Sequence, residues 1–288
     1  MKNRIFIVVG MAGSGKTSFC QRLYSWLSQE KCEIDHKTGL NRNIFSINLD
    51  PAVLNPKMPL NEDIRDEIDY QEVMEKYNLG PNGAIITSLN LYLLKMDELL
   101  NRIEANKNEK KNNIQCDNKK ELSDEFNKKV TLNENLKEEN SAPSYIIIDT
   151  PGQIEAFTWA SPGYVLIEGL KSLKSYKIEI LYVIDSEQTE QHAVFMSNMM
   201  YAASIMCRYQ VDTTCVFNKS DLAGTDKTLE WIRDYQKFRE SLPQEEMYSS
   251  MLSSMALHFE EFYNFIPTVG VSAFTGSGKS EFFKLFNK

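Results

Sequence analysis

Short runs of apolar residues recur along the chain, and several of them are apolar almost throughout rather than at alternate positions. Continuous apolar runs of this length are typical of parallel strands that are covered on both faces. The pattern predicts six β-strands: Arg4–Val9, Ile44–Leu49, Tyr145–Ile148, Ile178–Ile184, Thr213–Phe217 and Thr268–Val271.

Longer stretches between these runs repeat their apolar residues at helical spacing. They predict helices over Lys16–Gln29, Glu190–Arg208, Met247–Phe262 and Glu281–Phe286. Strands that alternate with helices indicate an α/β fold, with helices on both faces of a doubly wound, mostly parallel sheet. We therefore expect a single domain over residues 1–288.

One segment, Ala105–Ala142, breaks this alternation. It contains eight Lys, eight Asp or Glu and nine Asn residues, and few large apolar ones. So little apolar surface cannot offset the conformational entropy that ordering would cost. We predict that residues 105–142 form a mostly disordered, low-complexity insertion within the domain; a docking element is the alternative.

Composition narrows the class of protein. Hydrophobic residues make up 42% of the 288 positions, and the net charge is −8. This acidic balance argues against nucleic acid as a direct partner, because proteins that bind its backbone usually have a basic surface. No apolar run reaches the roughly 18 residues that a membrane span needs. The five cysteines lack C-x-x-C spacing, which favours free thiols in a reducing compartment. We expect a cytoplasmic protein that does not bind a membrane.

A glycine-rich loop follows the first predicted strand and precedes the first predicted helix. Its sequence, GMAGSGKT over residues 10–17, fits G-x-x-x-x-G-K-[ST] in the context where this motif binds phosphate. Backbone N–H groups of such a loop, and the helix start behind it, point toward phosphate oxygens. An ordinary glycine turn is the alternative. The predicted nucleotide contacts are Gly13, Ser14, Gly15, Lys16, Thr17 and Ser18.

A similar stretch, AFTGSGKS over residues 273–280, lies near the end of the chain, with Ala in the place of the first glycine. One domain of this size needs only one phosphate loop. We therefore predict that Ser272 and Ala273, which follow a predicted strand, form a wall of the base pocket. A second nucleotide site is the alternative.

A base-reading loop is predicted after the strand Thr213–Phe217, where the chain reads NKSD over residues 218–221. The Asp221 carboxylate can accept hydrogen bonds from N1–H and the 2-amino group of guanine, and adenine offers neither pattern. Asn218 would tie loops together, and the stem of Lys219 would lie along the base. A surface turn is the alternative, but the motif follows both a phosphate loop and a strand.

An acidic residue ends the strand that begins at Tyr145, in the sequence YIIIDTPGQ over residues 145–153. The Asp149 carboxylate would lie near Mg²⁺, through water, and the Gly152 N–H would sense the γ-phosphate. A simple Asp-Thr-Pro-Gly turn is the alternative. The three motifs in this order predict a protein that binds GTP or GDP with Mg²⁺.

The sequence GPNG over residues 80–83 separates two helical stretches, residues 70–79 and 86–100. We predict a tight turn here, because Pro fixes its own φ, Asn tolerates a left-handed backbone, and the glycines add freedom. Without the other motifs, a loop that merely joins two helices would be the default interpretation.

Together these motifs resemble those of the GPN-loop GTPases, and within that family they look most like the first paralogue. The resemblance covers nearly the whole chain except residues 105–142. It rests on the stretches Gly10–Thr17, Asn48–Ala52, Asp63–Asp66, Leu79–Gly83, Asp149–Gln153 and Asn218–Asp221.

The resemblance implies a nucleotide-dependent dimer, of identical chains or with a GPN-loop paralogue. In it, the Gly80–Asn82 loop of each chain enters the partner's active site, where Asn82 contacts the γ-phosphate, the phosphate product or the attacking water. The first paralogue is tied to RNA polymerase II assembly and nuclear import. We therefore expect polymerase subunits or assembly factors as partners, and a cytoplasmic protein that shuttles to the nucleus.

Hydrolysis of GTP needs neutralised charge and a water placed in line with the bond that breaks. We predict that Lys16 offsets charge on the β- and γ-phosphates. Thr17 would ligate Mg²⁺ directly, and Asp50 or Asp149 would hold its water shell. The resemblance supports Asp50, which lies at a predicted strand end and matches a position that the family uses around the metal.

Gln153 and Glu155 are candidates to orient the attacking water, and both match positions that the family uses. Glu155 equally fits an acid in the first turn of a helix, where the helix dipole favours it. Arg65 is expected to pair with Asp63 or Asp66 rather than to act as an arginine finger.

Two other functions stay open from the sequence. A phosphate-loop kinase would carry a lid with several arginines, which the chain does not show as a cluster, and would not be expected to contain N-K-x-D. A binding module would hold GTP and hardly hydrolyse it. The methionine-rich helix Val194–Met206 could offer a client surface, although packing in the core is the commoner explanation.

Overall fold

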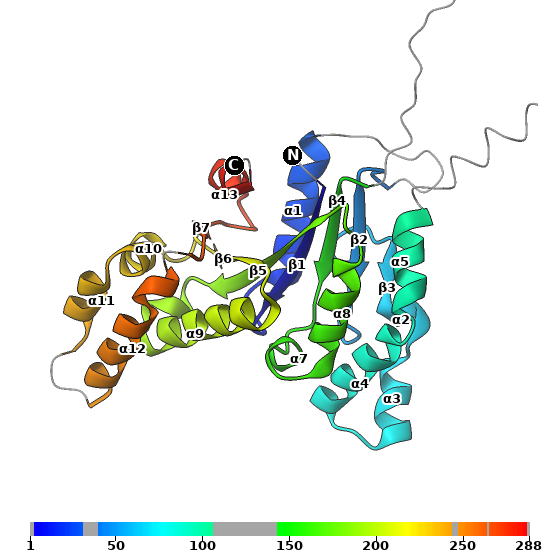
Figure 1. Ribbon diagram of the computed structural model, residues 1–288, viewed down its shortest axis with the longest axis horizontal. Helices are drawn as coiled ribbons and strands as arrows, with labels where there is room; N and C mark the ends of the chain where they lie inside the picture. Colours follow the sequence, from blue (N-terminus) through cyan, green and yellow to red (C-terminus); the bar gives the residue numbers. More distant parts are fainter. Residues whose placement is uncertain (1–2, 31–39, 106–142, 244–246, 264, 287–288) are drawn as a thin grey trace, which may run out of the picture.

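A single seven-stranded sheet organises the computed structural model (Figure 1), with strand order β3-β2-β4-β1-β5-β6-β7. The structure describes residues 3–30, 40–105, 143–243, 247–263 and 265–286. Every pairing between neighbouring strands of this sheet is parallel. The strands are β1 (Arg4–Gly10), β2 (Ile44–Asn48), β3 (Glu62–Asp63), β4 (Tyr145–Asp149), β5 (Lys177–Asp185), β6 (Asp212–Asn218) and β7 (Thr268–Gly270).

The central strands are buried along nearly their whole length, as their continuous apolar sequences predict. All seven residues of β1 are buried, and β1 pairs with β5 from Arg4 opposite Lys177 to Gly10 opposite Val183. The six predicted strands are confirmed, each with ends within one residue of the prediction. The short strand β3 was missed, because a pair of acidic residues gives no strand pattern.

Helices cover both faces of the sheet (Figure 1), so the predicted fold class is confirmed. One apolar cluster joins the sheet to α1 and α13 through Phe19, Trp26 and Phe282. The other joins it to α4, α5, α8, α9 and the helices that follow β6. The α-helices are α1 (Lys16–Glu30), α2 (Ile64–Glu67), α3 (Tyr70–Tyr77), α4 (Pro81–Leu93), α5 (Met96–Ala105), α7 (Glu155–Thr158), α8 (Ser161–Lys171), α9 (His192–Tyr209), α10 (Asp226–Arg233), α11 (Tyr235–Ser241), α12 (Met247–Tyr263) and α13 (Lys279–Phe286).

The structure bears on the predicted insertion and on the predicted client surface of the methionine-rich helix to different extents. Most of the predicted insertion, residues 106–142, lies outside the described residues, and Ala105 belongs to α5. In the methionine-rich helix α9, Met196 and Met199 are buried in the core, whereas Met200 is exposed. Within the described part of the chain, no helix is both long enough and apolar enough to cross a membrane.

The Gly80–Gly83 sequence does not form the predicted tight turn. Gly80 is the N-cap of α4 with extended backbone (φ −72°, ψ 169°), and Pro81 is the first helical residue. Proline suits this position because its φ matches the helix and its missing N–H needs no partner there. The left-handed residue is Asn78, with φ 49°, which ends α3. The turn prediction was wrong because Pro-Asn-Gly starts the helix instead of preceding it.

The parallel arrangement brings the motif loops to one edge of the sheet. The phosphate loop follows β1, Asp149 ends β4, and Asn218 ends β6. Asp50 follows β2 and Ser272 follows β7. Ligands of open parallel sheets bind beyond the carboxyl ends of the strands, so this edge is the candidate site.

Candidate active site

The phosphate loop owes its shape to two left-handed glycines. Gly13 has φ +81° and Gly15 has φ +85°, values that L side chains rarely adopt. A Cβ on Gly15 would also lie 2.5 Å from Nδ2 of Asn218. Gly15 therefore has to be glycine for its backbone angle and for the close approach of Asn218, and α1 begins directly after it.

Lys16 is a buried cation above this loop. Its side chain is 7% exposed, and Nζ donates to the Met11 carbonyl at 2.9 Å. Burial lowers the pKa of Lys16, while the nearby Asp149 and Asp50 carboxylates raise it. The structure therefore brings the three predicted charged residues together, and their two carboxylates outnumber the one ammonium, so a phosphate ligand would need a further cation for its charge to be neutralised.

Asp149 and Thr17 form an oxygen-rich pair next to Lys16. The Thr17 side chain donates a hydrogen bond to the Asp149 carboxylate, which is almost fully buried. Burial raises the pKa of Asp149 to about 6, although Thr17 and Lys16 oppose the shift. Oδ1 of Asp149 is buried and has no hydrogen-bond partner among the described residues.

This pair fits Mg²⁺. The ion prefers oxygen ligands and is usually held by one or two carboxylates together with substrate phosphates, rather than by a cage of protein ligands. The described residues contain no group of three or more His, Cys, Asp or Glu that could hold a metal ion. An unpaired buried carboxylate oxygen beside a threonine hydroxyl is a suitable second-sphere or direct ligand.

Asp50 lies just beyond the end of β2, near Lys16. Its Oδ1 accepts from the Ala52 N–H at 3.0 Å, and its own N–H donates to Oδ1 of Asn48 at 3.1 Å. Burial raises the pKa of Asp50, and the Ala52 N–H and the Lys16 ammonium lower it. Asp50 therefore lies close enough to Lys16 for each to affect the pKa of the other, and its role toward a metal stays a prediction.

The start of α4 lies beside Gln153 of the same chain. Nε2 of Gln153 donates to Oδ1 of Asn82 at 2.6 Å, and the Tyr70 hydroxyl donates to the Pro81 carbonyl at 3.1 Å. Oε1 of Gln153 is buried and unpaired among the described residues. The two candidate residues Asn82 and Gln153 thus meet directly, a contact within one chain that the sequence did not suggest.

Glu155 stands apart from this cluster. It is the first residue of α7 and is exposed. Its carboxylate makes no side-chain hydrogen bond or ion pair with the described residues. Its position agrees with the alternative interpretation, an acid in the first turn of a helix.

The predicted base loop is tied to the phosphate loop by Asn218. Nδ2 of this residue donates to the Ser14 carbonyl at 3.0 Å, and its Oδ1 accepts from the Ala273 N–H at 3.0 Å. The Ser272 hydroxyl donates to Oδ1 of Asp221 at 2.5 Å. Ser272 and Ala273 therefore lie against the base loop, as expected for a pocket wall.

Lys219 has a left-handed backbone, with φ 64°, and its Nζ pairs with Oδ2 of Asp185 at 2.6 Å. Asp185 was missed in the sequence. It ends β5 in the same way as Asp149 ends β4, so an acid at the carboxyl end of an apolar run was the available signal. The pair fixes the stem of Lys219 along the site.

The second glycine loop, residues 273–280, is bonded to α1 by Arg22. Nε and Nη2 of Arg22, on α1, donate to the Ala273 and Phe274 carbonyls at 2.8 and 2.7 Å. A Cβ on Gly278 would lie 2.3 Å from the Gly270 carbonyl oxygen. The bonds from Arg22 support the predicted role of this loop as a wall.

Two further candidates have defined partners. The Ser18 hydroxyl accepts from Nζ of Lys57 at 2.9 Å. Arg65 pairs with Asp63, with Nη2 and Oδ2 2.6 Å apart, as expected.

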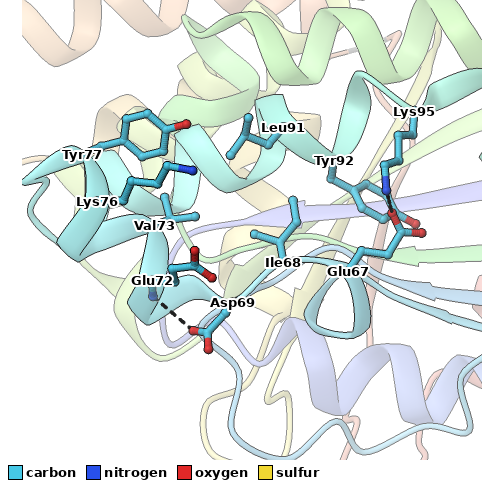
Figure 2. Close-up of a pocket in the computed structure, with 10 residues that line it drawn as sticks. All are labelled: Glu67, Ile68, Asp69, Glu72, Val73, Lys76, Tyr77, Leu91, Tyr92 and Lys95. Carbon is cyan, nitrogen blue, oxygen red and sulfur yellow. Dashed lines mark hydrogen bonds and ion pairs between the residues drawn. The ribbon is translucent and has the colours of Figure 1, made fainter.

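A separate pocket of about 310 Å³ lies between α3 and α4, away from these motifs (Figure 2). Ile68, Val73 and Leu91 supply its apolar wall, and Lys95 pairs with Glu67 at 3.1 Å on one side. None of the predicted nucleotide contacts lines this pocket.

Comparison with known proteins gives consistent relatives. A family model described as "Conserved hypothetical ATP binding protein" matches residues 8–115 and 121–288. The Saccharomyces cerevisiae protein named GPN-loop GTPase 1 is 38% identical over 98% of this chain and 64% of its own length. The Arabidopsis thaliana protein named GPN-loop GTPase QQT2 is 38% identical over 96% of this chain and 62% of its own. This chain thus spans less than two thirds of these relatives.

The fold also has a solved counterpart. The crystal structure of a GTPase from Pyrococcus abyssi in its apo form superposes with a TM-score of 0.69. It is 23% identical and covers 98% of this chain and 95% of its own. At this identity the likeness establishes the fold.

Proposed function

Because the chain belongs to the GPN-loop GTPase family, we propose that it binds GTP with Mg²⁺ and hydrolyses it to GDP and phosphate. The observation that carries the proposal is the convergence of three motifs at one edge of the sheet. Nδ2 of Asn218 donates to the Ser14 carbonyl of the phosphate loop, and the Asp149 and Asp50 carboxylates lie close enough to Lys16 to raise its pKa. A site of this kind holds phosphates at one end and a base at the other.

Guanine is the base that these contacts favour, although the description of the family model names ATP. Ser272 holds Oδ1 of Asp221, which leaves the second carboxylate oxygen and further lone pairs to accept from N1–H and the 2-amino group. Adenine has neither donor at these positions, so its binding would leave the carboxylate unpaired.

The phosphates would occupy the loop between Gly13 and Lys16. Lys16 would exchange its bond to the Met11 carbonyl for the β- and γ-phosphate oxygens, and so neutralise charge that develops as the bond breaks. Thr17 and Asp149 would hold Mg²⁺, with Asp50 on its water shell. When bound, Mg²⁺ would supply further neutralisation of the phosphate charge.

Gln153 is the residue best placed to orient the attacking water. Its amide nitrogen is held by Asn82, which leaves the buried oxygen Oε1 free to accept a hydrogen bond from water. Within one chain, Asn82 would set the direction of this amide; in the proposed dimer it would release Gln153 and contact the partner's site instead. Glu155 remains a second candidate, although its carboxylate is exposed.

The proposal includes a nucleotide-dependent dimer, of identical chains or with a GPN-loop paralogue. Membership of the family and the exposed position of Asn82 at the start of α4 support a loop that reaches a partner's site. Exposed aromatic side chains at Trp159 and Tyr164 give an apolar surface that a second chain could cover. The resemblance to the first paralogue supports RNA polymerase II subunits or assembly factors as partners, in the cytoplasm and nucleus.

Calorimetry with the purified protein in Mg²⁺ tests the nucleotide part of this proposal. We expect heat from GTP and GDP but not from ATP, and release of free phosphate without a phosphorylated acceptor. No heat from GTP or GDP would refute the site. GTP binding without phosphate release in a single-turnover assay would instead identify a binding module.

A further inference from the structure

The segment from Asp50 to Leu54, which carries the metal-side carboxylate, is tied at its start to β2. Asn48, the last residue of β2, is 1% exposed. Its Oδ1 accepts from the Asp50 N–H at 3.1 Å, and its Nδ2 donates to the Asp50 carbonyl at 3.2 Å. Both backbone groups of Asp50 are therefore held by one buried side chain.

The other end of the segment is tied by Arg65. Its Nη1 donates to the Val53 carbonyl at 3.0 Å and to the Leu54 carbonyl at 3.2 Å. Its remaining donors grip Asp63, with Nε 3.1 Å from both carboxylate oxygens and Nη2 2.6 Å from Oδ2. A guanidinium held in this forked way has a fixed plane, which a lysine ammonium could not reproduce.

Asp63 joins the two ends. Its Oδ1 accepts from Nδ2 of Asn48 at 2.9 Å and from the Arg65 N–H at 3.0 Å, where Asp63 is also the N-cap of α2. The three side chains thus form one network that bonds to the segment at Asp50 and again at Val53 and Leu54. With its donors engaged in this way, Arg65 is not directed at the phosphates as an arginine finger would be.

We propose that Asn48, Asp63 and Arg65 are positioning residues that hold the Asp50 carboxylate in place near Lys16 and Asp149. These three residues are called the Asp50 clamp. Catalytic groups must be held closely, since a displacement of about 1 Å can cost roughly a hundredfold in rate. Asp50 lies on an irregular segment without helix or strand bonds of its own, so the clamp supplies the order that secondary structure does not. The catalytic part of the inference rests on the proposed GTP hydrolysis; the ordering part does not.

Arg65→Lys in the full chain tests the clamp, because it keeps the charge and removes the fork. We expect hydrogen exchange at the amides of Asp50 and Ala52, whose N–H groups bond to the side chains of Asn48 and Asp50, to become at least about tenfold faster. We expect kcat for GTP to fall at least about tenfold and the half-saturating Mg²⁺ concentration to rise, with the GTP dissociation constant within about threefold.

Arg102→Lys is the matched control. Arg102 is another partly exposed arginine, which bonds to Glu62 and Glu67 outside the active site. This variant should leave kcat and the exchange of the Asp50 segment unchanged. The same loss in both variants would show a general effect of losing a paired arginine and overturn the clamp.

Two other results would also overturn it: unchanged exchange in Arg65→Lys, or faster exchange with an unchanged kcat. Should Arg65→Lys fail to fold, Arg65→Ala with added ethylguanidinium provides the second test, and the clamp requires rescue of both exchange and kcat. If the wild-type protein does not hydrolyse GTP, the proposed function fails, whereas the exchange measurements still decide whether the clamp orders the segment.

Discussion

Replacement of Asn218 by Ala is predicted to affect stability and nucleotide binding together. The side chain is 2% exposed and bonds at both ends, to the Ser14 carbonyl and from the Ala273 N–H, each at 3.0 Å. Two lost bonds cost about 1 kcal/mol each, and unpaired buried backbone groups add about 1 kcal/mol or more. We therefore expect the free energy of unfolding to fall by about 3 kcal/mol, or about 6–12 °C in Tm.

The same change should weaken GTP binding by about ten- to a hundredfold, because it separates the phosphate loop from the base loop. Thermal unfolding without nucleotide and GTP titration by calorimetry measure the two effects.

Asn198→Ala is the matched control for this prediction. Asn198 is also buried and also bonded at both ends, to the Val194 carbonyl and from the Tyr182 hydroxyl, but it lies on α9 outside the site. It should lose similar stability and keep its GTP affinity. An unchanged GTP affinity in Asn218→Ala, or an equal loss in both variants, would refute the reasoning.

Three further changes separate the roles in the site. Asn82→Ala should leave GTP affinity intact and slow turnover about tenfold, measured as phosphate release beside Asn90→Ala on the same helix; equal rates would remove Asn82 from the mechanism. Asp221→Asn should weaken the preference for GTP over XTP in competition binding, and an unchanged preference would refute the guanine assignment. Burial raises the pKa of Glu179, which accepts from Thr214, so stability should decline as pH rises through that pKa. Glu179 also pairs with the buried Arg4 at 3.5 Å, and Glu179→Gln loses that ion pair. The difference in Tm between the variant and the wild type should therefore shift in favour of the variant from pH 4.5 to pH 7.5; a pH-independent difference would contradict this.

The apolar pattern predicted the sheet well because its strands are buried on both faces and so carry continuous apolar sequences. It could not predict β3, whose residues Glu62 and Asp63 become a strand only by pairing with Ile47 and Asn48. The turn predicted at Gly80–Gly83 was wrong because the same residues satisfy the start of a helix. Composition within four residues does not distinguish these two uses of Pro-Asn-Gly.

The sequence identified candidate residues that belong to a local motif, and it missed contacts between residues that are far apart in the chain. Lys16, Asp149 and Asn218 have motif neighbours that identify them. Asn48 has a role only because Asp63, from another strand, lies beside it. The contact between Asn82 and Gln153 spans 71 positions in the chain, and no local pattern reports such a meeting.

The bonds from Arg22 to the loop after β7 have a consequence for ligand length. Arg22 lies on α1, whose first turn follows Gly15, and it holds the carbonyls of Ala273 and Phe274. Together with Asn218, Arg22 therefore fixes the distance between the loop proposed to hold phosphates and the proposed wall of the base pocket. In the proposed site, a ligand with a shorter or longer connection between base and phosphates could bind at one of these two loops but not at both.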